Sequence, residues 1–169
     1  MKIVIAGKHE LAVKLFNLLY FNKSFQLGFV TCKTERKNNR PSLRKTLKRH
    51  SIFPLNKNYS HETFFESLKT MRPDLIISAG FDKIIKNDVI KYFPNIVNVH
   101  YGLLPEYRGS NSIPWAILNN EKYIGITLHK VDSGIDSGDI FFQKKIRNDN
   151  NKSCKDLYLN AVRIGVELI

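Results

Sequence analysis

Residues 73–80 read PDLIISAG, and this stretch decides the fold. Its centre, Asp74–Ser78, is a continuous apolar run, which is typical of a parallel strand covered on both faces. A similar run opens the chain as MKIVIAG at residues 1–7, where we predict a strand over Lys2–Ala6. Two such strands indicate a sheet with helices on both of its sides.

Strands and helices alternate around these two runs. Leucines at positions 11, 15, 18 and 19 follow helical spacing. Pro41 suits a first helical turn, and Ser60 can cap a helix. We therefore predict helices over Glu10–Tyr20, Pro41–Arg49, Ser60–Lys69 and Asp88–Tyr92, and further strands over Gln26–Thr31, Phe53–Leu55 and Asn95–Val99.

The pattern changes late in the chain. Ile124–Val131 and Asp139–Ile146 read as two strands joined by the polar loop VDSGIDSGD, forming an antiparallel pair or a mixed continuation of the sheet. Ser153 can cap a final helix over Lys155–Leu168. The predicted fold class is α/β, an open, mostly parallel twisted sheet with helices on both faces and antiparallel strands late in the chain.

The composition is that of a soluble globular protein, with 43% hydrophobic and 25% charged residues among 169. No apolar run approaches the roughly 20 residues that a membrane-spanning helix needs. Cys32 and Cys154 are far apart, which disfavours a disulfide scaffold and a thiolate metal site. We therefore expect a cytoplasmic protein with no membrane partner and no bound metal.

The net charge is +12, and basic residues concentrate at 33–50. A solvated loop and helix face accounts for such a stretch in most proteins. No aromatic side chains interleave with these charges, so the stretch gives little indication of a nucleic-acid partner. A basic surface also attracts nucleotide-linked substrates or a polyglutamylated folate.

Asn98 and His100 are the first candidates for chemistry. Ligands of open parallel sheets bind beyond the carboxyl ends of the strands, and alternate residues of a strand share a face. An amide can stabilise an oxyanion and an imidazole can move protons near neutral pH. The alternative from these residues alone is an ordinary capped strand end.

Carboxylates and a loop complete the candidates. Asp132, Asp136 and Asp139 lie close together in the late polar loop, and one of them reaching His100 would orient its ring. The alternative is that they are turn residues beside glycines. Their spacing does not fit a calcium loop. His9, His50, His61 and His129 have no matching partners by spacing, so we interpret them as surface or core residues.

The segments NVHYGLLPEYRGS at 98–110 and GITLHKVDSGIDSGDI at 125–140 resemble the folate-dependent formyltransferase family. The family pattern is Asn-x-His, a Leu-Leu-Pro loop ending in glycine, and a later Asp-x-Gly turn. MKIVIAG and PDLIISAG match as well. The resemblance implies a single Rossmann-like formyltransferase catalytic domain over residues 1–169. Relatives continue beyond this length, so we expect the chain to be C-terminally incomplete relative to them.

The resemblance also implies roles. Asn98 is the expected oxyanion stabiliser, His100 the proton-transfer residue at the attacking amine, and Asp136 the partner that raises the pKa of His100. N10-formyltetrahydrofolate is the expected co-substrate. Its predicted binding residues are Asp82, Lys83, Ile84, Leu103, Leu104, Ser110, Asp132, Ser133, Gly134 and Ile135, with the loop segments acting largely through backbone groups.

Many members carry serine two places after the histidine, where this chain has Gly102. Any substrate contact made by that hydroxyl is therefore not expected here.

The acceptor amine differs among relatives. GKHELAV at 7–13 replaces the phosphate loop of enzymes acting on glycinamide ribonucleotide, which argues against that substrate. The run at 109–140 is most similar to amino-sugar formyltransferases. We expect a dTDP- or UDP-linked 4-amino or 3-amino sugar as the substrate, for surface polysaccharide synthesis, and a homodimer as the assembly. The alternatives are methionyl-tRNA as acceptor, or a non-catalytic folate- or nucleotide-binding remnant.

Overall fold

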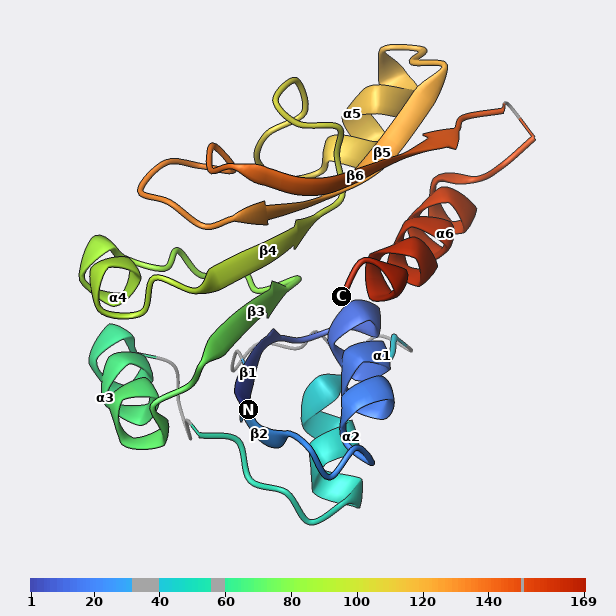
Figure 1. Cartoon of the computed structure of the whole chain (residues 1–169). Helices are drawn as coiled ribbons and strands as arrows, with labels where there is room; N and C mark the ends of the chain where they lie inside the picture. Colours follow the sequence, from blue (N-terminus) through green and yellow to red (C-terminus); the bar gives the residue numbers. More distant parts are fainter. Residues whose placement is uncertain (32–39, 56–59, 150) are drawn as a thin grey trace. The chain divides into compact units, whose positions relative to one another are not determined.

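The computed structural model of the protein describes residues 1–31, 40–55, 60–149 and 151–169 (Figure 1). The chain forms two compact units, Met1–Ile96 and Val97–Ile169. Cys32 and the part of the basic stretch that precedes Arg40 lie outside the described residues. No helix among the described residues is long and apolar enough to cross a bilayer.

The first unit is built on three parallel strands in the order β2-β1-β3, with bounds β1 (Lys2–Gly7), β2 (Gln26–Val30) and β3 (Leu75–Ala79). Ile5 of the central strand is paired with Phe29 on one side and Ile77 on the other. All three side chains are buried. Because β1 and β3 are covered on both faces, their sequences are the continuous apolar runs that predicted them.

Helices cover both faces of these strands (Figure 1). One face carries α1 (Glu10–Leu19) and α2 (Leu43–Arg49), and the other carries α3 (His61–Met71) and α4 (Asn87–Tyr92).

The predicted Ser60 cap is confirmed. Its hydroxyl accepts a hydrogen bond from the Thr63 backbone N–H, and the Thr63 side chain bonds back to the Ser60 backbone. In α2 the cap is Ser42, whose side chain accepts from the Lys45 backbone N–H. Pro41 therefore precedes this helix and is not part of it.

The strand predicted over Phe53–Leu55 is wrong. The Leu55 backbone N–H donates to the Phe29 carbonyl at 2.8 Å, but no ladder forms around this bond. Phe53 is 89% exposed, so the apolar side chains that suggested a buried strand do not all point into the core. Within the described residues this backbone bond to β2, together with the Ser67 hydroxyl that donates to the Leu55 carbonyl, holds the segment in place without making it a strand.

The second unit contains three antiparallel strands in the order β4-β5-β6, with bounds β4 (Ile96–His100), β5 (Tyr123–Lys130) and β6 (Ile140–Arg147). The final helix, α6 (Cys154–Glu167), packs on β5 and is capped by Ser153, as predicted. The predicted α/β class is confirmed, with parallel strands first and antiparallel strands late in the chain.

One helix of this unit was not predicted from the sequence. No helix or strand is predicted between Val99 and Ile124, and the structure forms α5 (Ser112–Leu118) there. Asn111 precedes it in a left-handed conformation with φ of 60°, and Ile113 and Ala116 are buried. Pro114 lies in the first turn, where a missing N–H costs nothing.

Candidate functional site

The pairing of β4 with β5 determines which side chains meet. In the antiparallel register Asn98 lies opposite His129, and His100 lies opposite Thr127. Opposed residues of an antiparallel pair project to the same face, so these four side chains lie on one face of the two strands. The pairing of β5 with β6 shifts register between Leu128 and His129, which places a bulge beside the site.

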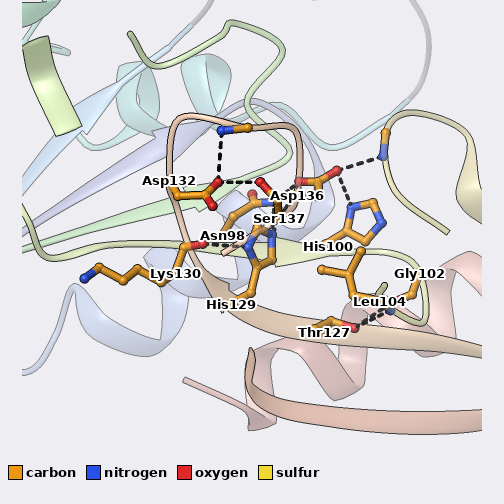
Figure 2. Close-up of polar contacts among 12 residues, drawn as sticks. Asn98, His100, Gly102, Leu104, Thr127, His129, Lys130, Asp132, Asp136 and Ser137 are labelled. Atoms are coloured by element: carbon orange, nitrogen blue, oxygen red, sulfur yellow. Dashed lines mark hydrogen bonds and ion pairs between the residues drawn. The ribbon is translucent and has the colours of Figure 1, made fainter. Parts of the chain in front are cut away.

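Asp136 is the centre of a polar cluster on this face (Figure 2). Its Oδ1 accepts a hydrogen bond from Asn98 Nδ2 at 3.3 Å. Its Oδ2 lies 3.3 Å from His100 Nδ1 and accepts from the Gly109 backbone N–H at 2.9 Å. The three predicted catalytic residues are therefore brought together. Asp136 has a left-handed backbone with φ of 47°, which aspartate tolerates better than most residues.

His129 belongs to the same cluster, and sequence reasoning missed it. Its Nδ1 donates to the Lys130 carbonyl at 2.7 Å, and its Nε2 lies 3.1 Å from Asn98 Nδ2 and 3.4 Å from Asp136 Oδ1. The interpretation as a core residue is right because His129 is 2% exposed. Spacing along the sequence does not reveal its partners, which are Asn98 and Asp136. The two N–H groups of the Asn98 amide are directed at His129 Nε2 and Asp136 Oδ1.

His100 is buried and contacted at both ring nitrogens. Nδ1 faces Asp136, and Nε2 lies 2.5 Å from the Tyr107 carbonyl oxygen and 3.3 Å from the Ser112 hydroxyl. A carboxylate and a carbonyl both accept hydrogen bonds, so they favour the ring that carries a proton on each nitrogen.

Burial of His100 acts against this preference. Removal from water lowers the pKa of His100 most strongly, while the Asp136 carboxylate and the Tyr107 carbonyl raise it. The nearby His129 lowers it further, and the net result is a pKa below the ordinary histidine value. Asp136 therefore raises the pKa of His100, the direction expected of it, and burial outweighs this effect.

Asp136 is ionised at neutral pH. Burial raises the pKa of its carboxyl group, but the nearby His129 and His100 rings and the Gly109 N–H together hold it below its usual range. The cluster thus combines a fixed negative charge, an imidazole with little water around it, and an amide donor.

Acid should weaken the second unit through His100. A histidine whose pKa is lowered by folding contributes stability above its unfolded pKa of about 6.5, and that stability is lost as the pH falls toward the folded value. We expect the free energy of unfolding to fall from pH 7.5 to 5.5, and to fall less in His100→Gln. Urea titrations can follow the fluorescence of Trp115, the chain's one tryptophan, which lies in α5 of this unit. Equal pH slopes in both proteins would contradict this assignment.

The late polar loop is shaped by Asp132. Its Oδ1 accepts from the Gly134 backbone N–H at 3.1 Å and from the Ser137 hydroxyl at 2.8 Å. Ser133 and Ile135 are exposed, with Ile135 at 67%. The side chain of Asp132 holds a turn, and the backbone and apolar side chain beyond it face solvent.

The other predicted binding residues of this unit differ in exposure. Leu104 is 4% exposed and belongs to the core. Leu103 packs on Gly125, where an added Cβ would lie 2.1 Å from Leu103 Cδ2. Ser110 is exposed. An open hollow of 510 Å³ adjoins the segment that contains Leu103 and Tyr107. Its lining also includes Tyr123, Gln143 and Lys145.

Asp82, Lys83 and Ile84 lie in the first unit, after β3. Asp82 forms an ion pair with Lys8, with 2.7 Å between Oδ2 and Nζ. Lys83 and Ile84 are exposed, Ile84 at 80%. Across the residues that the structure describes, no group of three or more His, Cys, Asp or Glu side chains could hold a metal ion.

Comparison with known proteins adds the family. Residues 24–167 match the family model described as Formyl transferase. The chain is 31% identical to a methionyl-tRNA formyltransferase of Finegoldia magna over 99% of its own length and 56% of the relative. It thus spans about half the length of such curated relatives.

Two solved structures are similar in fold over 99% of the chain. One is WlaRD, a sugar 3N-formyl transferase determined with dTDP and 5-N-formyl-THF, with a TM-score of 0.80, 30% identity and 60% of that chain covered. The other is phosphoribosylglycinamide formyltransferase from Bacillus halodurans, with a TM-score of 0.84, 24% identity and 91% of that chain covered. With a family model matched over most of its residues, the chain belongs to the formyl transferase family.

Proposed function

We propose that this chain transfers a formyl group from N10-formyltetrahydrofolate to the amine of a dTDP- or UDP-linked 4-amino or 3-amino sugar, for surface polysaccharide synthesis in the cytoplasm. The observation that carries the proposal is the cluster of Asn98, His100 and Asp136, in which Asp136 lies 3.3 Å from each of the other two. Acyl transfer to an amine needs a donor for the oxygen that becomes negative and a group that accepts the proton.

Each residue has a role in this proposal. The amine nitrogen forms a bond to the formyl carbon, the bond from that carbon to N10 of the folate breaks, and N10 takes a proton. His100 accepts the proton that the amine releases at Nε2 once this nitrogen has left the Tyr107 carbonyl, and ionised Asp136 beside Nδ1 stabilises the charged ring. Asn98 turns one of the N–H groups now held by His129 and Asp136 toward the formyl oxygen. A donor placed for such an oxygen contributes roughly 10²–10³ in rate.

The exposed segments fit the co-substrate. Ile135 offers an apolar surface at the tip of a turn whose backbone is fixed by Asp132. Ile84 offers another in the first unit. Residues 132–136 would contact the pterin through backbone groups, and the bound co-substrate supplies the formyl group. The presence of dTDP and a formylated folate with WlaRD supports this choice of co-substrate and acceptor.

Methionyl-tRNA is the second candidate acceptor. The relative from Finegoldia magna carries that activity in its name, at an identity similar to that of WlaRD. Helix α2 adds four basic residues, Arg44, Lys45, Lys48 and Arg49. A tRNA complex built on such charges would weaken steeply with salt.

A formyl-transfer assay tests the proposal. N10-formyltetrahydrofolate is offered with dTDP- and UDP-linked 4-amino sugars, the matching 3-amino sugars and methionyl-tRNA in parallel, and formylated product is measured by mass spectrometry. We expect turnover on an amino sugar that falls at least about 10²-fold in His100→Ala. Turnover on methionyl-tRNA alone would show that the acceptor is methionyl-tRNA and not an amino sugar. Folate binding without turnover on any acceptor would leave a binding remnant as the function.

A further inference from the structure

The segment Tyr101–Asn111, named here the histidine loop, contacts the cluster through two backbone groups. The Tyr107 carbonyl accepts a hydrogen bond from His100 Nε2 at 2.5 Å, and the Gly109 N–H donates to Asp136 Oδ2 at 2.9 Å. The place of this loop is therefore part of the geometry of His100 and Asp136.

Thr127 holds the start of the histidine loop (Figure 2). Its hydroxyl donates to the Gly102 carbonyl at 2.6 Å and accepts from Gln143 Nε2 at 3.0 Å and from the Leu104 N–H at 3.4 Å. Thr127 is fully buried. Its one proton and both lone pairs are therefore used inside the protein.

Gln143 adds a second attachment from the neighbouring strand. It lies opposite Thr127 in the register of β5 with β6. Besides Thr127, its Nε2 donates to the Leu104 carbonyl at 2.9 Å. The residue between the two attachments, Leu103, packs on Gly125, and the Tyr107 N–H donates to the Leu103 carbonyl at 3.1 Å. The loop is thus held at its start, where it leaves β4. The hydrogen bond between Leu103 and Tyr107 extends this constraint to Tyr107.

We propose that Thr127 and Gln143 are positioning residues that fix the histidine loop and, through Tyr107 and Gly109, hold His100 and Asp136 in register for the reaction. Neither side chain touches the reacting groups. The Tyr107 hydroxyl is attached at the exposed surface, where it donates to Glu121 at 2.7 Å and accepts from Asn119 Nδ2 at 3.2 Å. Such bonds compete with water and hold the loop weakly. The catalytic part of this inference rests on the proposed function.

Hydrogen exchange tests the structural part without any substrate. In Thr127→Val the shape is kept and the hydroxyl is lost. We expect the Gly109 amide to exchange at least about tenfold faster while the amides of α6 keep their protection. Thr127→Ser restores the hydroxyl and should restore slow exchange. Thr70→Val is the matched control, because it removes a hydroxyl bound to the Glu66 carbonyl on α3, outside this unit.

Kinetics test the catalytic part on whichever acceptor the wild-type protein formylates. We expect kcat of Thr127→Val to fall about tenfold or more with little change in KM, and Thr127→Ser to recover most of it. Gln143→Met, which loses the two hydrogen bonds that Nε2 donates from an exposed position, should show a smaller effect in the same direction. It serves as the test if Thr127→Val does not fold.

The outcomes separate this inference from the proposed function. Unchanged Gly109 exchange in Thr127→Val and Gln143→Met would overturn the positioning role. Fast Gly109 exchange with wild-type kcat would overturn its catalytic part. If the wild-type protein formylates no acceptor, the proposed function fails, and the exchange measurements still decide whether Thr127 and Gln143 hold the loop.

Discussion

Asp136→Asn should reduce kcat/KM for formyl transfer by about 10³-fold. The change removes the charge that favours a proton on His100, so the Tyr107 carbonyl alone would oppose the effect of burial on the pKa of that ring. It also places an amide where the carboxylate now accepts from the Asn98 and Gly109 N–H groups. The new amide N–H group would then face the N–H group of Asn98 or of Gly109 with no acceptor between them, which disturbs the remaining cluster.

Asp139→Asn is the matched control for this change. Asp139 lies in the same loop, three residues later, and its side chain is exposed. We expect its kcat/KM to stay within about threefold of wild type, as for most exposed positions. Fluorescence of Trp115 shows whether each variant is folded. An Asp136→Asn protein that is folded and as active as Asp139→Asn would remove Asp136 from the mechanism.

Asn98→Asp should lower kcat by about 10³-fold, because the shape is kept while the N–H donor is replaced by an acceptor. The new carboxylate would lie where Asn98 now contacts Asp136 at 3.3 Å. Two carboxylates at this separation disfavour each other's charge, so one of them would retain its proton at higher pH. Either the oxygen donor or the ionised partner of His100 is then lost.

Asn120→Asp controls for the chemical change itself. Asn120 follows α5 in the second unit, is exposed, and has a left-handed backbone that aspartate also tolerates. We expect wild-type kcat in this variant. Comparable losses in Asn98→Asp and Asn120→Asp would show that the added charge, and not the place of Asn98, reduces the rate.

The sequence predicts those features that depend on local physics. β1 and β3 are visible because strands buried on both faces are continuously apolar, and the caps of α3 and α6 are visible because Ser60 and Ser153 stand just before helical patterns. Asn98 and His100 share a face because the strand period is two. Each of these predictions depends only on residues that lie close together in the sequence.

Features that depend on register or loop conformation could not be predicted in the same way. His129 joins the cluster because β5 pairs antiparallel with β4 at one register, and a shift by one residue would point it to the other face. The path of the late loop, in which Asp136 has a positive φ, brings Asp136 and not Asp132 to the cluster. The lowered pKa of His100 depends on burial, which spacing does not show.

The absence of a side chain at Gly102 is tied to the path of the chain at Tyr107. A Cβ at this place would lie 2.6 Å from the Tyr107 carbonyl oxygen and 2.7 Å from His100 Nε2. The serine that many relatives carry therefore cannot be added to this chain while Tyr107 keeps its bond to His100. A substitution at 102 and a change in the path of the chain through 107 should therefore be epistatic, with a joint effect that differs from the sum of the separate effects.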